Sequence, residues 1–479
     1  MDNNDNKIFK EVLEENYPPQ DTSKFIPLTV DDLIEILGLT IKKDEINKLL
    51  SFLAQLSAYT EDSQINISFN APSSTGKSFI PTEIAELFPQ EDVIEVGYCS
   101  PTAFFHDYGV FDKEKQGYIV DLSRKILIFL DQPHNLLLQH LRPFLSHDKK
   151  EIRLKITDKA QKFGLRTKNI YLIGFPAVVF CTVGLNIDEQ EATRFLLLSP
   201  ETTNEKLREA IKEKIKKEAD KTSYIRTVES DPKLVLLRQR VLAIKEEHIT
   251  AINLSDVPLV EKLFLQRTKK VKPRHQRDIG RLISLIKVFA LLNVWHRERL
   301  AGGAIVANED DIKETFKAWD VISESQELNL PPYVYDLYRD VIAEVFNKKN
   351  SEVDGGVKTG LTRQEIFQKH YEIYGRFLPE WQLKQIIPML ETAGLIMQEQ
   401  NPLDKRQTLV YPTTEFSVSQ TQNNSGMDGG VEADEDQEAT AQIKSCYTCG
   451  SKRFWRRPDD ELMCATCHPP ASGEQKEPE

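Results

Sequence analysis

The residues with the clearest chemistry form a phosphate-binding pattern near position 75. The pattern comprises Ala71, Pro72, Ser73, Ser74, Thr75, Gly76, Lys77 and Ser78. A loop of this kind turns its backbone N–H groups inward around a phosphate, and a helix that starts directly after it adds a favourable dipole. Lys77 is expected to reach the β- and γ-phosphates of a nucleotide, and the Ser78 hydroxyl to ligate Mg²⁺. Ala71 stands where the usual first glycine would be. The apolar run before the loop and the helical pattern after it favour a nucleotide site over a chance turn.

A second pattern is an apolar run that ends in a carboxylate. Residues 125–130 are followed by Asp131 and Gln132. A buried strand of this kind carries Asp131 to the carboxyl edge of a sheet, where it can hold the hydration shell of a Mg²⁺ ion. Glutamate usually follows this aspartate and activates the attacking water. Gln132 can orient a water but cannot take its proton, so either hydrolysis is slower or another carboxylate serves.

Four of the six cysteines form a metal-binding pattern near the end of the sequence. Cys446 and Cys449 make one CxxC pair, and Cys464 and Cys467 make a second pair after a spacer of 14 residues. Two such turns present four thiolates to one tetrahedral ion, as in a structural Zn²⁺ site. A module this small cannot bury a core, so its fold is expected to depend on the metal. The aromatic and basic residues of the spacer either pack this module or contact a single nucleic-acid strand.

Composition excludes several classes of protein. The chain has 479 residues, of which 40% are hydrophobic and 28% charged, so it is neither fibrous nor wholly disordered. The net charge is −12, but 13 of the 74 acidic residues and only 6 of the 62 basic ones follow residue 412. The acidity is therefore largely a property of the tail and does not argue against a nucleic-acid partner. There is no long apolar run and no signal-peptide pattern, so we expect a cytoplasmic protein without a membrane partner.

Short apolar runs alternate with helical patterns between residues 61 and 199. This alternation predicts an α/β fold in which a mainly parallel sheet is covered by helices on both faces. Residues 329–412 show three helical patterns and then a strand–turn–strand pattern, the order of a winged helix. The remaining regions are an N-terminal helical segment (1–60), an all-α region (200–328), a disordered acidic linker (413–444), a zinc ribbon (445–470) and a tail (471–479).

With the phosphate loop and the acidic strand in place, residues 60–325 resemble an AAA+ ATPase. More narrowly, they are similar to ring helicases of the minichromosome-maintenance type and to the replicative helicases of phages, plasmids and other mobile elements. The resemblance implies that residues 61–199 are the ATPase core and residues 200–328 its helical lid. It gives Thr182 the role of the sensor-1 residue, which positions the attacking water. It also gives Arg194 the role of the arginine finger, which reaches the nucleotide of the neighbouring subunit.

The same resemblance extends to a sensor-2 arginine and a pore hairpin. Arg277 is the better match to the sensor-2 arginine, and Arg281, one turn later, is the alternative. Residues 151–174 contain two strand-like runs around a basic turn, at the place where the minichromosome-maintenance clade inserts its pore hairpin. The alternative is an ordinary solvated hairpin. The basic residues expected to track a phosphate backbone are Lys155, Lys159, Lys162, Arg166 and Lys168.

The winged-helix pattern supplies a second expected DNA contact. In residues 378–396, Lys384 and Gln385 are expected to face outward. The positions expected to face inward are Leu383, Ile386, Ile387 and Leu390. Lys405 and Arg406 fall at the tip of the expected wing, where a phosphate contact is favourable. The alternative is that this module only mediates protein contacts.

Together these patterns predict an ATP-driven DNA motor that uses Mg²⁺ and carries Zn²⁺. An arginine finger acts in trans, so the resemblance implies a homo-oligomeric ring, a hexamer in this family. The expected partners are a single DNA strand in the pore, duplex DNA at the winged helix, and replication proteins such as a primase or an initiator. The alternative function is a DNA-bound regulatory AAA+ switch or loader, as in transposition or defence, without unwinding activity. Gln132 favours the switch, and the basic hairpin favours the motor.

Overall fold

The computed structural model describes most of the chain between residues 21 and 413 and two short strands beyond it. The described residues are 21–97, 109–131, 133, 135–158, 166–182, 193–268, 271–351, 358–402, 404–413, 454–456 and 462–464. The chain divides into two units, Met1–Phe416 and Ser417–Glu479. None of the helices in the described part combines the length and the hydropathy needed to span a bilayer.

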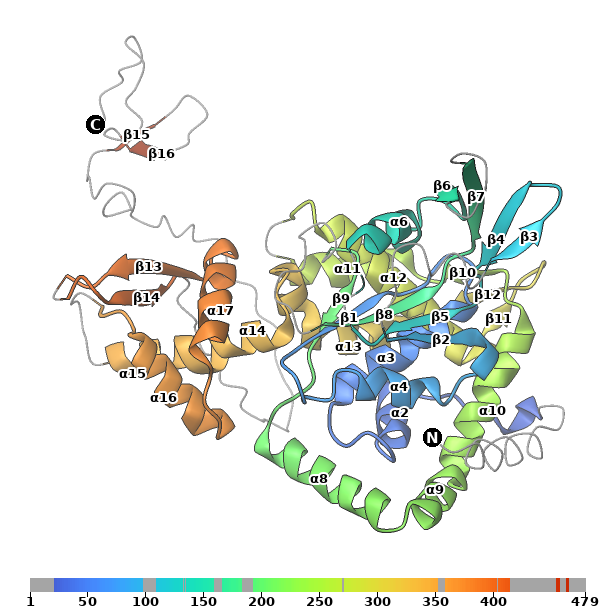
Figure 1. Cartoon of the computed structure of the whole chain (residues 1–479), viewed down its shortest axis with the longest axis horizontal. Helices are drawn as coiled ribbons and strands as arrows, with labels where there is room; N and C mark the ends of the chain where they lie inside the picture. Colours follow the sequence, from blue (N-terminus) through green and yellow to red (C-terminus); the bar gives the residue numbers. More distant parts are fainter. Residues whose placement is uncertain are drawn as a thin grey trace, which may run out of the picture. The chain divides into compact units, whose positions relative to one another are not determined.

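The first unit is built around a five-stranded parallel sheet (Figure 1). The strands lie in the spatial order β2-β5-β8-β1-β9, and all four neighbouring pairs are parallel. Every residue of β1, β5, β8 and β9 is buried, as expected for strands covered on both faces. The bounds are β1 (Ile67–Asn70), β2 (Val93–Val96), β5 (Ile126–Phe129), β8 (Ala177–Thr182) and β9 (Leu196–Leu198).

In β5, β8 and β9, alternate residues enter two different cores. Along β5, Ile126 and Ile128 join a core that includes helices of the N-terminal segment, whereas Leu127 and Phe129 join a core with α6. This alternation confirms the predicted parallel sheet with helices on both faces. The helices before and within the sheet region are α2 (Val30–Leu37), α3 (Glu45–Leu56), α4 (Phe79–Ala85) and α6 (Asn135–Leu145).

The N-terminal helices are part of the main core rather than a separate segment. The apolar face of α3 is fully buried, and α3 packs on α4, on β8 and on α12 of the later helical region. The sequence predicted helices within residues 1–60 but not this shared core, because amphipathic periodicity shows that a face is buried without showing which partner covers it.

A second, four-stranded sheet stands beside the central one. Its order is β3-β4-β7-β6, with β4 and β7 parallel and the two outer pairs antiparallel. Figure 1 shows the hairpins β3–β4 and β6–β7 side by side. The bounds are β3 (Val110–Asp112), β4 (Gly117–Asp121), β6 (Glu151–Asp158) and β7 (Arg166–Ile173).

Residues 200–328 are mainly helical, but the expectation of an all-α region is wrong. Three short strands form a sheet in the order β10-β12-β11, with bounds β10 (Ala251–Leu254), β12 (Ala304–Ala307) and β11 (Glu298–Arg299). The strands were missed because apolar runs of only four residues, such as AINL and AIVA, cannot be told from helix by periodicity, and long helical patterns stand on both sides of them. The helices are α8 (Asn204–Ala219), α9 (Lys221–Glu229), α10 (Pro232–Glu247), α11 (Val257–Arg267), α12 (His275–Leu292) and α13 (Glu309–Glu327).

Residues 330–413 have a hydrophobic core of their own. A helix of three consecutive parts, α14 (Pro332–Asp336), a π-helical segment (Leu337–Ala343) and α15 (Glu344–Asn350), is followed by two further helices and a hairpin. The further elements are α16 (Arg363–Tyr374), α17 (Glu380–Thr392), β13 (Ile396–Gln400) and β14 (Thr408–Pro412). Leu361 adds one bridge to Val410 of β14. The order of elements is the one predicted from the sequence.

The second unit is described only at two short antiparallel strands. These are β15 (Phe454–Arg456) and β16 (Leu462–Cys464), in which Phe454 pairs with Cys464. The expected acidic linker, Cys446, Cys449 and Cys467, and the side chain of Cys464 lie outside the described residues.

Candidate functional site

The phosphate loop leads from the end of β1 to the start of α4, as the sequence predicted. Ala71 N–H donates to the carbonyl oxygen of Thr182 at 3.3 Å, so the loop leaves the sheet beside the end of β8. Inside the loop, the Thr75 hydroxyl donates to the Pro72 carbonyl at 2.9 Å and closes a turn. Ser74 and Gly76 have φ angles of +65° and +95°, in the left-handed region. A glycine at position 76 meets this requirement without steric strain.

Strand order places the loop where two connections diverge. The chain leaves β1 toward β2 at one end of the sheet, and it leaves β8 past β1 toward β9 at the other end. Because β1 and β8 are neighbours, the carboxyl ends of these two strands form the switch point of the sheet. In open α/β sheets, ligands bind outside the carboxyl ends of the strands at such a switch point.

Asp131 and Thr182 lie at the same edge of the sheet as the loop. Asp131 follows β5 and is exposed, and Thr182 ends β8 and is 3% exposed. Thr182 is level with Asn70 in the register of β1 and β8. Gln132 lies outside the described residues.

The Cys181 thiol lies near both the loop and Asp131. Its Sγ donates to the Lys77 carbonyl oxygen at 3.3 Å, and both Lys77 and Asp131 act on it electrostatically. Burial raises the pKa of this thiol to about 12, so Cys181 is a protonated core residue. Cys181 belongs to β8, which lies between β5 and β1 in the sheet, so the strand that precedes Asp131 and the strand that precedes the loop flank it on either side.

Arg194 lies at the opposite edge of the sheet. It precedes β9 and its Nε donates to the Ser146 hydroxyl at 2.7 Å. The same edge is held together by Asn66, which accepts a hydrogen bond from the N–H of Leu196 at 2.8 Å and donates its side-chain amide to Leu145. Asn66 directly precedes β1, whereas the phosphate loop follows it, so the length of β1 separates Arg194 from the loop of its own chain.

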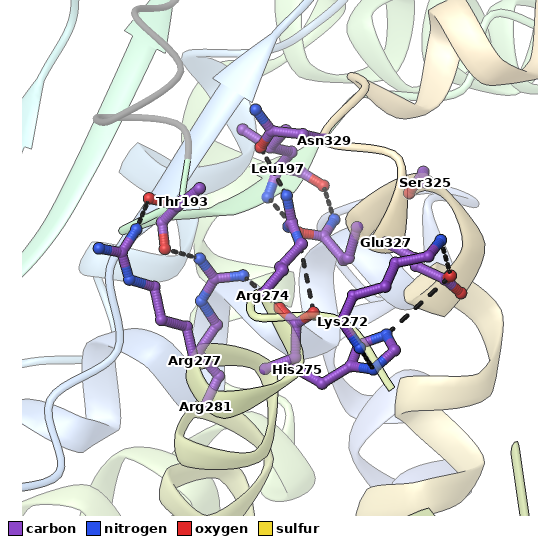
Figure 2. Close-up of polar contacts among 12 residues, drawn as sticks. Thr193, Leu197, Lys272, Arg274, His275, Arg277, Arg281, Ser325, Glu327 and Asn329 are labelled. Carbon is purple, nitrogen blue, oxygen red and sulfur yellow. Dashed lines mark hydrogen bonds and ion pairs between the residues drawn. The ribbon is translucent and has the colours of Figure 1, made fainter. Parts of the chain in front are cut away.

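The two sensor-2 candidates lie beside Arg194. Both donate to Thr193, Arg277 to its hydroxyl and Arg281 to its carbonyl oxygen (Figure 2). They differ in environment. Arg281 is paired with Asp278 at 3.0 Å, and burial lowers its pKa to about 10, whereas Arg277 is exposed. Exposure favours Arg277 as the arginine available to a ligand, and Arg281 as a structural residue.

Sequence reasoning missed the polar residues that hold the start of α12. Arg274 donates to Asn329 at 2.7 Å and to Asp278 at 3.2 Å, and burial lowers the pKa of its guanidinium. Lys272 pairs with Glu327 at the end of α13 (Figure 2). The contacts with Asn329 and Glu327 link residues 55 positions apart, so no local pattern reveals them.

The basic residues of the β6–β7 hairpin are divided between its two faces. In the register, Lys155 is opposite Asn169, and Lys168 is opposite Ile156, one position further along. Neighbouring positions of a strand point to opposite faces, so Lys155 and Lys168 do not share a face. Lys159 and Lys162 lie outside the described residues, and Arg166 begins β7.

Both hairpins carry cations over aromatic rings. The guanidinium of Arg153 lies 5.8 Å from the ring centre of Tyr171, and the Lys115 ammonium of the β3–β4 hairpin lies 5.1 Å from the same ring. Lys168 lies 5.5 Å from the ring of Tyr118. Arg153 and Lys115 were not selected from the sequence, because only the pairing of β4 with β7 brings the two hairpins together.

In residues 378–413, the burial of α17 agrees with its periodicity. Lys384 and Gln385 are exposed, although Lys384 pairs with Glu380 at 2.9 Å. The inward positions are Leu383, Ile386, Ile387 and Leu390, each at most 3% exposed. Lys405 and Arg406 are exposed in the turn between β13 and β14, as predicted for a wing tip.

Among the described residues, no group of three or more His, Cys, Asp or Glu side chains is arranged to hold a metal ion. The predicted zinc ligands are not among them, so the prediction of a zinc site stays a prediction.

Comparisons with known proteins find similarity among solved structures. No family profile and no curated protein sequence matches this chain. Among solved structures, a full-length MCM homolog from Methanopyrus kandleri aligns at 13% identity with a TM-score of 0.40. That alignment covers 68% of this chain and 62% of the archaeal protein, so the chain spans less than two thirds of its length. Drosophila ORC bound to DNA aligns at 10% identity with a TM-score of 0.21, over 86% of this chain and 97% of that one. The mixed α/β fold with its parallel central sheet is consistent with a P-loop-type core.

Proposed function

We propose that this chain is an ATP-hydrolysing AAA+ motor that forms a ring, by resemblance a hexamer, and moves on DNA. The observation that carries the proposal is the division of the charged groups between two edges of one sheet. Lys77 and Asp131 lie at the carboxyl edge, and Arg194 and Arg277 lie at the amino edge. A complete site then needs two chains, and a repeated head-to-tail contact closes into a ring.

In this proposal the loop N–H groups and Lys77 hold the nucleotide phosphates. Ser78 and Asp131 would hold Mg²⁺, which neutralises charge on the β- and γ-phosphate oxygens. The Thr182 hydroxyl orients the attacking water. The water oxygen bonds to the γ-phosphorus while the bond to the β–γ bridging oxygen breaks, and Arg194 of the next subunit stabilises the charge of that transition state. Gln132 can accept a hydrogen bond from the water but not its proton, so the proton goes to another acceptor.

The DNA grip is assigned to the β6–β7 hairpin together with the β3–β4 hairpin beside it. Arg153 and Lys155 lie on one face of β6, and Lys115 joins them from the β3–β4 hairpin. Cations on a protruding ribbon suit sequence-independent contact with a phosphate backbone. By resemblance, Lys159, Lys162, Arg166 and Lys168 are assigned the same role, although Lys168 lies on the other face of the hairpin from Arg153 and Lys155.

The C-terminal modules are assigned to duplex DNA and to zinc. Residues 329–412 have the element order of a winged helix, with Lys405 and Arg406 at the wing. Residues 445–470 carry the four-cysteine pattern of a zinc ribbon, and β15 and β16 supply the short hairpin that such a ribbon needs. Together they suit a helicase that replicates a mobile element, with a primase or an initiator as partner.

A second candidate is a DNA-bound switch that binds ATP and controls a partner without unwinding DNA. Gln132 favours it, because slow hydrolysis prolongs the ATP-bound state. The two candidates differ in whether DNA contact and ATP turnover are coupled.

The test is ATP hydrolysis with and without single-stranded and forked DNA, together with strand displacement on the fork. For the motor, DNA stimulates hydrolysis and the fork opens, and Lys77→Ala abolishes both activities. Arg153→Ala/Lys155→Ala keeps basal hydrolysis but loses stimulation and displacement. Lys313→Ala/Lys317→Ala removes the same charge from the exposed surface of α13 and serves as the matched control. Slow hydrolysis that ignores DNA, without displacement, would replace the motor by the switch.

A further inference from the structure

A buried lysine that the sequence did not single out contacts the phosphate loop from α8. The side chain of Lys206 is 8% exposed, and its ammonium is paired with the carboxylate of Asp44, which is 1% exposed. Lys206 Nζ also donates to the carbonyl oxygens of Glu201 at 2.9 Å and Thr75 at 3.3 Å. An ammonium has three hydrogens, so these three acceptors use its full donor capacity.

Asp44, the partner of Lys206, is itself fixed by two hydrogen bonds. Asp44 Oδ1 accepts hydrogen bonds from the Glu201 N–H at 2.7 Å and from the Asn47 side-chain amide at 2.9 Å. Asn47 also donates to the carbonyl oxygen of Ser199 at 2.9 Å. The start of α3, the end of β9 and the start of α8 are therefore joined around the lysine, and its ammonium has little freedom to move away from the loop.

The contact with Thr75 determines the direction of the next peptide group. The chain has no cis peptide bond among its described residues, and in a trans peptide the C=O and the following N–H point in opposite directions. Holding the Thr75 carbonyl toward α8 therefore directs the Gly76 N–H to the other side of the loop. Gly76 has a φ angle of +95°, and a Cβ at this residue would lie 3.9 Å from Lys206 Nζ.

We infer that Lys206 is a positioning residue for the phosphate loop: its bond to the Thr75 carbonyl keeps the Gly76 N–H turned toward the nucleotide phosphate. This inference rests on the proposed nucleotide site. Because glycine adopts both signs of φ readily, the 75–76 peptide would otherwise be free to rotate. Asp44 neutralises the charge of Lys206, so the effect is one of direction rather than of attraction to the phosphate.

The experiment separates that effect from mere stability. Asp44→Asn keeps the Oδ1 acceptor but leaves the buried Lys206 ammonium without its counter-charge, so this single variant reports only the effect of that charge. Asp44→Asn/Lys206→Met removes the donor and leaves no unpaired buried charge. Lys43→Met is the matched control, because Lys43 joins the same two elements through an exposed pair with Glu205 at 3.0 Å that does not involve the loop.

For each variant we measure the dissociation constant of fluorescent methylanthraniloyl-ADP in the presence of Mg²⁺, and the melting temperature of the protein. We expect Lys43→Met to bind within about threefold of wild type. Asp44→Asn/Lys206→Met is neutral at this pair, as the wild type is, and we expect it to bind about tenfold more weakly than wild type or worse, the size of one lost hydrogen bond. Lys206→Gln in the Asp44→Asn background is too short to reach Thr75 and is expected to show the same loss, so it serves if the methionine variant does not fold.

Two outcomes overturn the inference in different ways. If the wild type binds the nucleotide and the double variant binds it as tightly as the wild type, Lys206 has only a structural role and the inference fails alone. If the wild type does not bind the nucleotide, the proposed function fails and the inference fails with it.

Discussion

Mixing two inactive variants tests whether the arginines act across a subunit interface. In Lys77→Ala the phosphate loop is disabled while Arg194 stays intact, and in Arg194→Ala the loop stays intact while the arginine is lost. The path along β1 from Asn66 to Ala71 spans roughly 16 Å, about twice the reach of an extended arginine side chain. Arg194 therefore cannot serve the loop of its own chain, and each variant lacks a different half of the site.

In the proposed ring, the expected recovery follows from chance pairing of the two variants. Alone, Arg194→Ala is expected to lose about 10³-fold or more in ATP turnover, and Lys77→Ala to be inactive. In an equal mixture, about one quarter of the interfaces join an intact loop to an intact arginine, because the two halves come from adjacent chains of a heterologous ring. The mixture should therefore regain about one quarter of the wild-type rate, far above either variant alone.

The two variants are dissociated into subunits, mixed and reassembled, and two different affinity tags verify that mixed assemblies form. Steady-state ATP hydrolysis of the mixture is then measured. Arg267→Ala is the control for loss of an arginine, because Arg267 pairs with Asp320 on an exposed surface and should keep wild-type activity. Mixed assemblies without recovered hydrolysis would show that Arg194 does not act in trans. A fully active Arg194→Ala would remove it from the site altogether.

Three further predictions concern stability, pH and metal. Arg297 and Asp311 form a bidentate pair whose side chains are 6% and 2% exposed, so Arg297→Met leaves the Asp311 carboxylate buried without a partner. We expect the free energy of unfolding measured in urea to fall by about 3–5 kcal/mol. Lys313→Met, on the same helix as Asp311, should lower it by less than about 1 kcal/mol. Burial, with the carboxylates nearby, raises the pKa of Glu201 from 4.5 to about 7, so the folded state keeps a proton that the unfolded chain releases, and stability falls as pH rises through this interval. Glu201→Gln should therefore gain melting temperature over wild type from about pH 5 to about pH 8, and a constant difference would contradict this reasoning. Metal analysis should find about one zinc per chain, and none in Cys446→Ser; zinc retained in that variant would exclude the four-cysteine site.

The sequence alone determined features that depend on neighbouring residues. The phosphate loop and the apolar run before Asp131 are short patterns in which each residue supports the next, so their local structure could be predicted. The inward and outward positions of α17 followed from helical periodicity in the same way. Alternating strands and helices predicted a parallel sheet, because such a sheet needs a crossover after every strand.

Tertiary structure decided what depends on residues far apart in the chain. Lys206 lies 131 residues from Thr75, and no periodicity connects them. Lys155 and Lys168 looked equivalent in the sequence, but the register of β6 and β7 sends them to opposite faces. Likewise, Arg194 and Lys77 belong to one motif set, yet the order β2-β5-β8-β1-β9 and the direction of its strands place them at opposite edges. A sequence specifies which residues can do chemistry, whereas the distances between them come from packing that only the folded chain establishes.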